Sequence, residues 1–201
     1  MQLTNPKDIL TILHLIRSGL ASGILTKEEV VDWADKIVSK EEQPDIFFID
    51  LVLSSSKSTN DVIRYFSEYL NFDNPTVQGR PLLGLLFKQY KSEQINLEQT
   101  FSKLFRLKYE AIFSEREEGY IYSIESNYAC ARDEIYGTIG EVQNELEKFL
   151  GFYKDYSIEG YEQWHDLDKV VELKLEEDYQ LQQQQYKEYL RGATRPWWKF
   201  W

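Results

Sequence analysis

A helix-start signal that recurs along the chain constrains the fold more than any other feature. In residues 26–29, 58–61 and 96–99, a Thr, Ser or Asn is followed three residues later by Glu, Asp or Gln. The first side chain can accept a hydrogen bond from the backbone N–H three residues on, and the second can bond back to the backbone N–H at the start. We therefore expect a capped helix to begin at each of these positions.

The spacing of apolar residues also favours helices behind these starts. Segment 27–38 carries apolar residues three and four positions apart, which places them on one face of a helix. Segment 59–70 repeats this arrangement at an offset of 32 residues. Further helices are expected to open at Pro6, Pro44 and Pro81, because the first position of a helix needs no N–H. The apolar face of the first segment consists of Val30, Trp33, Ala34, Ile37 and Val38.

Together these signals predict an all-α protein of about seven to nine helices. Helix–turn–helix units recur with a period in the thirties, which is typical of helical hairpins that stack side by side. Capped amphipathic helices resemble one another, so an irregular helical bundle stays open beside stacked hairpins. We interpret residues 1–190 as one helical domain, with sub-units at 1–95 and 96–190, and residues 191–201 as a basic, aromatic C-terminal tail.

The second half of the chain has weaker signals. Residues 97–114 are expected to form one long helix, and the apolar positions of 139–151 predict another. Residues 119–131 are rich in tyrosine and isoleucine, which suits a strand, but their apolar residues also share one helical face, so we favour a helix. A long, glutamine-rich helix is expected over 167–190.

Charge limits the classes of partner. The formal net charge is −11 in 201 residues. Such a chain is repelled by nucleic-acid phosphates and attracted to basic proteins, chiefly through the rate of association. Solubility alone is the alternative reason for the charge. We expect a basic protein partner and no nucleic acid.

The compartment is predicted from cysteine usage and hydropathy. Cys130 is the single cysteine, so no intrachain disulfide can form, and this fits a reducing cytosol. The first ten residues lack the pattern of a secretory signal, and no apolar run reaches the roughly 18 residues that a membrane helix needs. We expect a cytoplasmic protein without membrane contact.

The sequence contains no strong catalytic or metal-binding pattern. Glu162 and His165 have the Glu-x-x-His spacing of helical di-iron sites, but those sites need the motif twice, and the only other histidine is His14. Cys130 has no histidine near it in sequence to act as a base. We therefore expect no catalytic residue, no metal and no cofactor.

Two surfaces remain as candidates for partner binding. The segment 159–178 is acidic, and its carboxylates at 168, 172 and 176 would share one face of a helix, where they repel one another. The tail places tryptophans beside Arg195 and Lys199, and it could fold back on its own domain or contact a partner, since Trp and Arg are enriched at interface hot spots. Candidate partner-binding residues are Asp32, Asp35, Asp168, Glu172, Glu176, Trp197, Trp198 and Trp201.

The segment 19–70 carries a family resemblance. Gly23 and Ile24 precede the first capped helix, and Trp33, Ala34 and Asp35 lie within it. This stretch resembles small, uncharacterised bacterial helical proteins of the immunity-protein type, which are found beside polymorphic toxins. The resemblance implies a non-enzymatic protein that binds and neutralises a secreted toxin, and it carries no site residues over to this chain.

The resemblance and the charge favour the same function. We expect an immunity protein that occludes a basic toxin by stoichiometric binding, through carboxylates of 159–178 or of the helix at 27–38. A helical adaptor or scaffold, acting through stacked helices and the tryptophan-rich tail, is the alternative. An enzyme would need a deep pocket with perturbed titrating groups.

Overall fold

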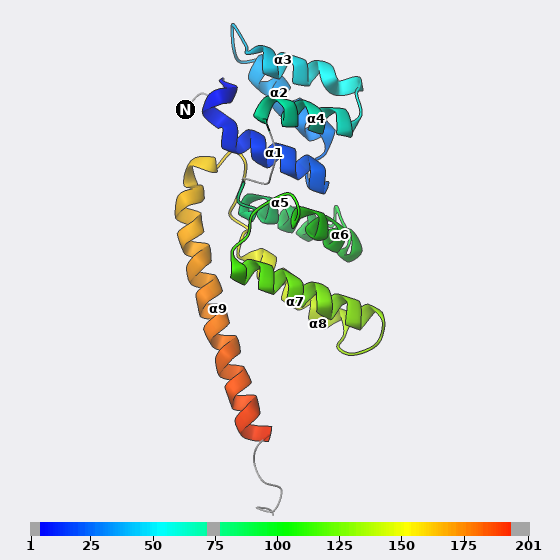
Figure 1. The fold of residues 1–201 in the computed structure, drawn as a ribbon, viewed down its shortest axis with the longest axis vertical. Helices are drawn as coiled ribbons and strands as arrows, with labels where there is room; N and C mark the ends of the chain where they lie inside the picture. The colour runs from blue at the N-terminus through cyan, green and yellow to red at the C-terminus, as the bar shows by residue number, and fades with distance from the viewer. Residues whose placement is uncertain (1–4, 72–76, 194–201) are drawn as a thin grey trace, which may run out of the picture. The chain divides into compact units, whose positions relative to one another are not determined.

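The computed structural model describes residues 5–71 and 77–193, and it confirms the all-α class. The described part contains nine α-helices and three short 3₁₀ helices (Figure 1), and its only β-type pairing is an isolated bridge between Gln78 and Ile112. The chain divides into two compact units, Met1–Tyr161 and Glu162–Trp201, called unit 1 and unit 2 below. The interpretation of residues 1–190 as one domain stays a prediction.

Unit 1 contains eight of the described α-helices. They are α1 (Leu10–Ser22), α2 (Lys27–Val38), α3 (Ile46–Leu53), α4 (Thr59–Leu70), α5 (Arg80–Lys91), α6 (Leu97–Leu107), α7 (Glu115–Arg132) and α8 (Ile139–Gly151), with 3₁₀ helices at Pro6–Ile9 and Ser54–Ser56. Unit 2 consists, in its described part, of α9 (Trp164–Ala193), and a 3₁₀ helix at Tyr161–Gln163 lies at the junction.

The predicted capping boxes are confirmed at α2 and α6. Thr26 accepts a hydrogen bond from the backbone N–H of Glu29, whose carboxylate accepts one from the Thr26 N–H, and Asn96 and Gln99 pair likewise. At α4 the Ser58 hydroxyl caps the helix but donates to the Asp61 carboxylate at 2.7 Å. Asp is one methylene shorter than Glu, and here its carboxylate bonds the hydroxyl.

Two further capping boxes open α7 and α8. They join Ser114 to Glu117 and Thr138 to Glu141. Both follow the Ser/Thr-x-x-Glu spacing, but neither is among the capping boxes predicted above. At the other end of a helix, Gly23 adopts the left-handed conformation, with φ of 75°, and ends α1.

The prediction of one helix over 97–114 was wrong, because α6 ends at Leu107. The chain then turns to meet a distant segment. The Ile112 N–H donates to the Val77 carbonyl at 2.9 Å, and the Gly79 N–H donates to the Ile112 carbonyl at 3.0 Å. This long-range pairing overrides the local helical preference. The helix favoured over 119–131 is confirmed as part of α7.

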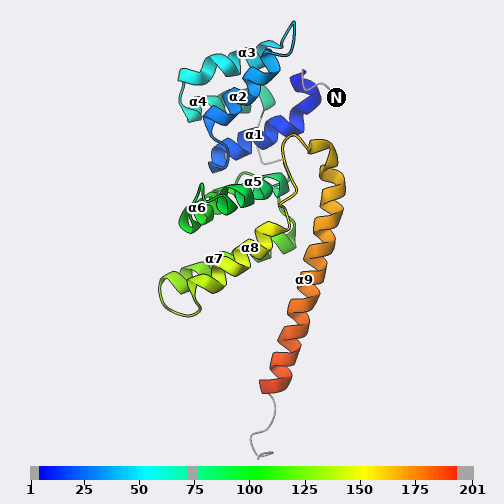
Figure 2. The ribbon, with the colours of Figure 1, turned by 180° about the vertical axis from the view of Figure 1, so that it is seen from behind.

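The helices of unit 1 pack in layers (Figures 1 and 2). α2 lies against α3, α1 against α4 and α6, α5 against α6 and α8, and α7 against α8. α5–α6 and α7–α8 are hairpins of consecutive helices. The main neighbours of α1 are distant in sequence, so a regular hairpin repeat does not extend through the unit, and a helical bundle describes it.

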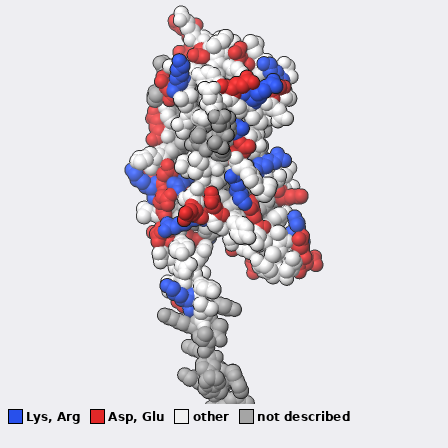
Figure 3. All heavy atoms as spheres, in the orientation of Figure 1, with Lys and Arg blue, Asp and Glu red and all other residues white. Residues whose placement is uncertain are grey.

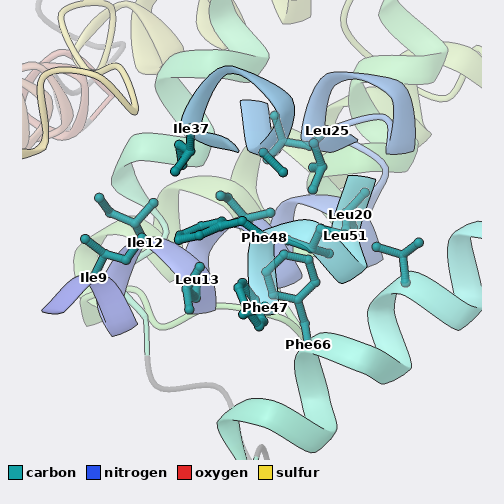
Figure 4. Packing of buried hydrophobic residues seen from close by; sticks show 14 residues of the cluster. Ile9, Ile12, Leu13, Leu20, Leu25, Ile37, Phe47, Phe48, Leu51 and Phe66 are labelled. Atoms are coloured by element: carbon teal, nitrogen blue, oxygen red, sulfur yellow. The ribbon is translucent and has the colours of Figure 1, made fainter. Parts of the chain in front are cut away.

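Aromatic rings from α3 and α4 pack against α1 and α2 in the core. Phe48 lies at the centre of the cluster in Figure 4, with Leu25 and Ile37 on one side and Leu13 and Phe47 on the other. Fully burying each such side chain contributes about 1.5–3 kcal/mol. The core therefore holds α2 by its apolar face and leaves the opposite face in solvent.

A buried ion pair connects α5, α7 and the segment after α8. The Arg80 Nε donates to Glu117 Oε1 at 2.8 Å, and the Tyr153 hydroxyl donates to the same oxygen at 2.9 Å. The Ser114 N–H and hydroxyl donate to Glu117 Oε2. Glu117 is 0% exposed and Arg80 6% exposed, so the ion pair is buried. We call Arg80, Ser114, Glu117 and Tyr153 the Arg80–Glu117 node.

The hydrogen bonds of the node keep Glu117 ionised. Burial alone would raise the pKa of Glu117, but the hydrogen bonds from Arg80 and Ser114 outweigh burial and hold that pKa below its ordinary value. Burial and the Glu117 charge raise the pKa of the Tyr153 hydroxyl, which therefore stays a donor. Each member of the node is thus in the protonation state that its partner requires.

α5 closely approaches the segment after α8 at Gly84. A Cβ added there would overlap the carbonyl oxygen of Tyr153 and lie 2.9 Å from the Tyr156 Cβ. Only glycine fits this contact without a backbone shift. By contrast, a Cβ added at Gly119 in α7 would meet open space.

Glu117→Gln should lower the free energy of unfolding by about 3–5 kcal/mol, because it removes the carboxylate charge that pairs with the buried Arg80 guanidinium. Urea unfolding followed by circular dichroism measures the change. Glu118→Gln, at an exposed neighbour in α7, is the control and should stay within about 0.5 kcal/mol. Equal effects of the two substitutions would contradict the role of the node.

The same node predicts a dependence on pH. The pKa of Glu117 is lower in the folded than in the unfolded chain, so its contribution is complete above the ordinary value of 4.5 and is lost as the pH falls through the folded pKa. The stability difference between wild type and Glu117→Gln should therefore shrink below pH 4.5. A constant difference down to the acid transition would contradict this.

Gly84→Ala should lower the free energy of unfolding by about 1–3 kcal/mol through overpacking. Gly119→Ala is the matched control, since it too replaces a helical glycine, and it should stabilise by about 0.4–1 kcal/mol. Thermal unfolding of the two variants side by side measures both effects. A stabilising Gly84→Ala would show that α5 and the segment after α8 are not in close contact.

Candidate functional site

A groove of about 680 Å³ lies on unit 1 between α1, α2, α5 and the segment at 158–159. A volume of this size lies within the range, about 300–1,000 Å³, of pockets that bury a bound group. The apolar lining consists of Ile16, Leu25, Val30, Trp33, Ile37, Leu85 and Ile158. The charged rim consists of Glu29, Asp32, Lys36, Lys40, Glu41 and Glu159.

α2 supplies most of the groove, and the core holds it in place. The Trp33 ring meets the Phe48 ring edge-on at 5.6 Å, and it is half-buried, so its other side lines the groove. Ile37 belongs both to the core cluster and to the lining. The lining is therefore a continuation of the core to the surface.

The rim of the groove carries more carboxylates than ammonium groups. Glu29 is engaged in its capping box and accepts from the Thr26 N–H at 2.7 Å. The side chains of Asp32, Glu41 and Glu159 make no hydrogen bond or ion pair with any described residue, and Asp32 and Glu159 are exposed.

Two lysines complete the rim, and a third lies beside it. The side chains of Lys36 and Lys40 also make no hydrogen bond or ion pair with any described residue. The rim thus holds four carboxylates against two ammonium groups. Near it, burial lowers the pKa of Lys103, and the Glu29 carboxylate opposes that shift.

The structure separates the two candidate carboxylates of α2. Asp32 lies on the rim of the groove, whereas Asp35, also exposed, is not among the groove residues. Both stay predicted partner-binding residues.

The other candidate carboxylates belong to α9 in unit 2. Glu172 is exposed, and Asp168 and Glu176 are half-buried. Glu176 accepts a hydrogen bond from the Gln180 amide at 2.6 Å. The predicted acidic face is thus only partly open to solvent. On the face drawn in Figure 3, acidic and basic side chains are interspersed, so charge alone selects no binding surface there.

The tryptophans of the tail, Trp197, Trp198 and Trp201, lie outside the described residues. His14 is half-buried in α1, where burial first and the Arg17 charge second lower its pKa. Cys130 is a half-buried thiol in α7. In residues 5–71 and 77–193, no cluster of His, Cys, Asp and Glu side chains is arranged to hold a metal, and no helix has the length and apolar character to cross a membrane.

Searches with family models, curated proteins and solved structures find no match to this chain. The groove therefore has to be interpreted from its own residues. Sequence reasoning did not single out Leu85 or Ile158 as site residues. No sequence signal marks them, because they meet α2 only through the packing of α5 and the segment after α8.

The rim carboxylates should contribute little to folding. Asp32→Lys and Glu159→Lys, alone or combined, are expected to change the free energy of unfolding by less than about 0.5 kcal/mol per site, because neither side chain has a partner to lose. Urea unfolding measures this. A larger loss at either site would show that the carboxylate stabilises the fold.

Proposed function

We propose that this protein is a non-enzymatic, acidic binding protein of the cytoplasm. Its partner is a basic protein, and the family resemblance of residues 19–70 names the class: a bacterial toxin that an immunity protein neutralises by stoichiometric occlusion. No cofactor or metal takes part.

The observation that carries the proposal is the composition of the groove. An apolar lining that continues the core, with a charged rim on which Asp32, Glu41 and Glu159 pair with no described residue, is the kind of surface that binds a protein segment. Trp33 adds a half-buried aromatic side chain to it, and aromatic side chains are enriched at the energetic centres of interfaces.

The net charge of −11 supports a basic partner. Long-range attraction raises the rate at which such a partner is captured, by one to three orders of magnitude at low salt. Rapid capture suits an immunity protein, because a toxin must be bound before it reaches its target. Many antibacterial toxins carry basic, phosphate-binding sites that an acidic surface can occlude.

A helical adaptor is the second candidate, and one observation favours it. The last turns of α9 expose Leu181, Tyr186 and Leu190, with exposed fractions of 43–59%. A helix that exposes several large apolar side chains provides a surface for assembly. In that case the partner would bind α9 and would tolerate high salt.

The proposal predicts one stoichiometric partner in the native host. Tagged protein should capture a single basic protein, identified by mass, and the association rate with purified partner should fall by roughly tenfold or more as salt rises from about 0.1 M to 1 M, where the Debye length shortens from about 10 Å to 3 Å. Capture of many proteins, of this chain alone, or of a partner whose association rate ignores salt would contradict it.

A further inference from the structure

We propose that the groove on unit 1 binds a basic amphipathic helix of the partner. This inference rests on the proposed function and names the binding mode. The helix would place its apolar stripe on the lining around Trp33 and Ile37, and its Lys and Arg residues against Asp32, Glu41 and Glu159.

The walls of the groove favour a helix over an extended segment. α1, α2 and α5 form them, and the described residues contain no sheet whose edge could pair with a strand. In the helix-in-groove mode, affinity comes from apolar side chains at positions i, i+3, i+4 and i+7, which do not need free backbone groups on the receptor. Trp33, Leu85 and Ile158, the half-buried residues of the lining, can contact such side chains.

Charge selects a basic helix. The side chains of Asp32, Glu41 and Glu159 pair with no described residue, and they come from α2, the turn after it and the segment before α9. An approaching cation therefore meets carboxylates from separate elements of the rim. Lys36 and Lys40 occupy only part of the rim, and there the partner helix needs an acidic or neutral residue, which would set its orientation.

Charge also disfavours a second copy of this chain as the occupant. A second copy carries the same charge of −11 and would be repelled at long range. A separate basic protein is thus the occupant that the rim complements.

The test is selection from a displayed library of helical peptides on the immobilised full-length protein. Selected peptides should be enriched in Lys and Arg and should carry an apolar stripe at i, i+3, i+4 and i+7. The strongest peptide, synthesised and labelled, is then measured by fluorescence anisotropy. It should shift the indole N–H resonance of Trp33, which is identified by its absence in Trp33→Phe.

Matched charge reversals complete the test. The double variant Asp32→Lys with Glu159→Lys should weaken binding of that peptide by about tenfold or more, and Glu118→Lys, at an exposed carboxylate of α7 outside the groove, should leave it within about twofold. Selection without basic enrichment, no selection at all, an unshifted Trp33 resonance, or equal binding by the double variant would each overturn the inference.

The outcomes separate the inference from the proposed function. If wild type captures one basic partner that the double variant captures equally well, the groove is not the site, but the function stands. If the groove binds basic helices and the host supplies no basic partner, the binding mode stands and the immunity function fails.

Discussion

A buried carboxylate–guanidinium pair is the constraint on which the packing of α5, α7 and the segment after α8 depends. Glu117 caps α7 through Ser114 and at the same time accepts hydrogen bonds from Arg80 on α5 and from Tyr153 after α8. A carboxylate excluded from solvent must have every strong acceptor site satisfied. The three elements therefore cannot shift independently, and the start of α7 is held by tertiary as well as local hydrogen bonds.

That constraint extends to the groove. Leu85 follows Gly84, the residue at which α5 touches the chain after α8, and Ile158 lies two residues beyond Tyr156. The Lys88 ammonium donates to the Tyr156 carbonyl at 2.7 Å, and this hydrogen bond is a second contact between α5 and the segment after α8. Two parts of the groove wall are thus positioned by packing near the Arg80–Glu117 node, while α2 is positioned by the aromatic core.

Local signals predicted much of the fold, whereas the site needed tertiary packing. Helix starts such as Thr26 and Asn96 could be predicted because a cap and its partner lie within four residues of each other. The end of α6 could not, because Ile112 pairs with Val77 across the chain. Asp32 was singled out from the charge of its helix, yet nothing local distinguishes it from Asp35. The difference between them depends on α5 and on residues 158–159, which lie far away in sequence.

Hydrogen exchange, with the captured host partner bound and absent, tests most directly whether the groove is the binding surface. Binding should slow exchange in α2 and at residues 157–160, and it should leave the exposed turns of α9 unchanged. Slower exchange confined to α9, with α2 unaffected, would contradict the groove as the site and would favour the adaptor.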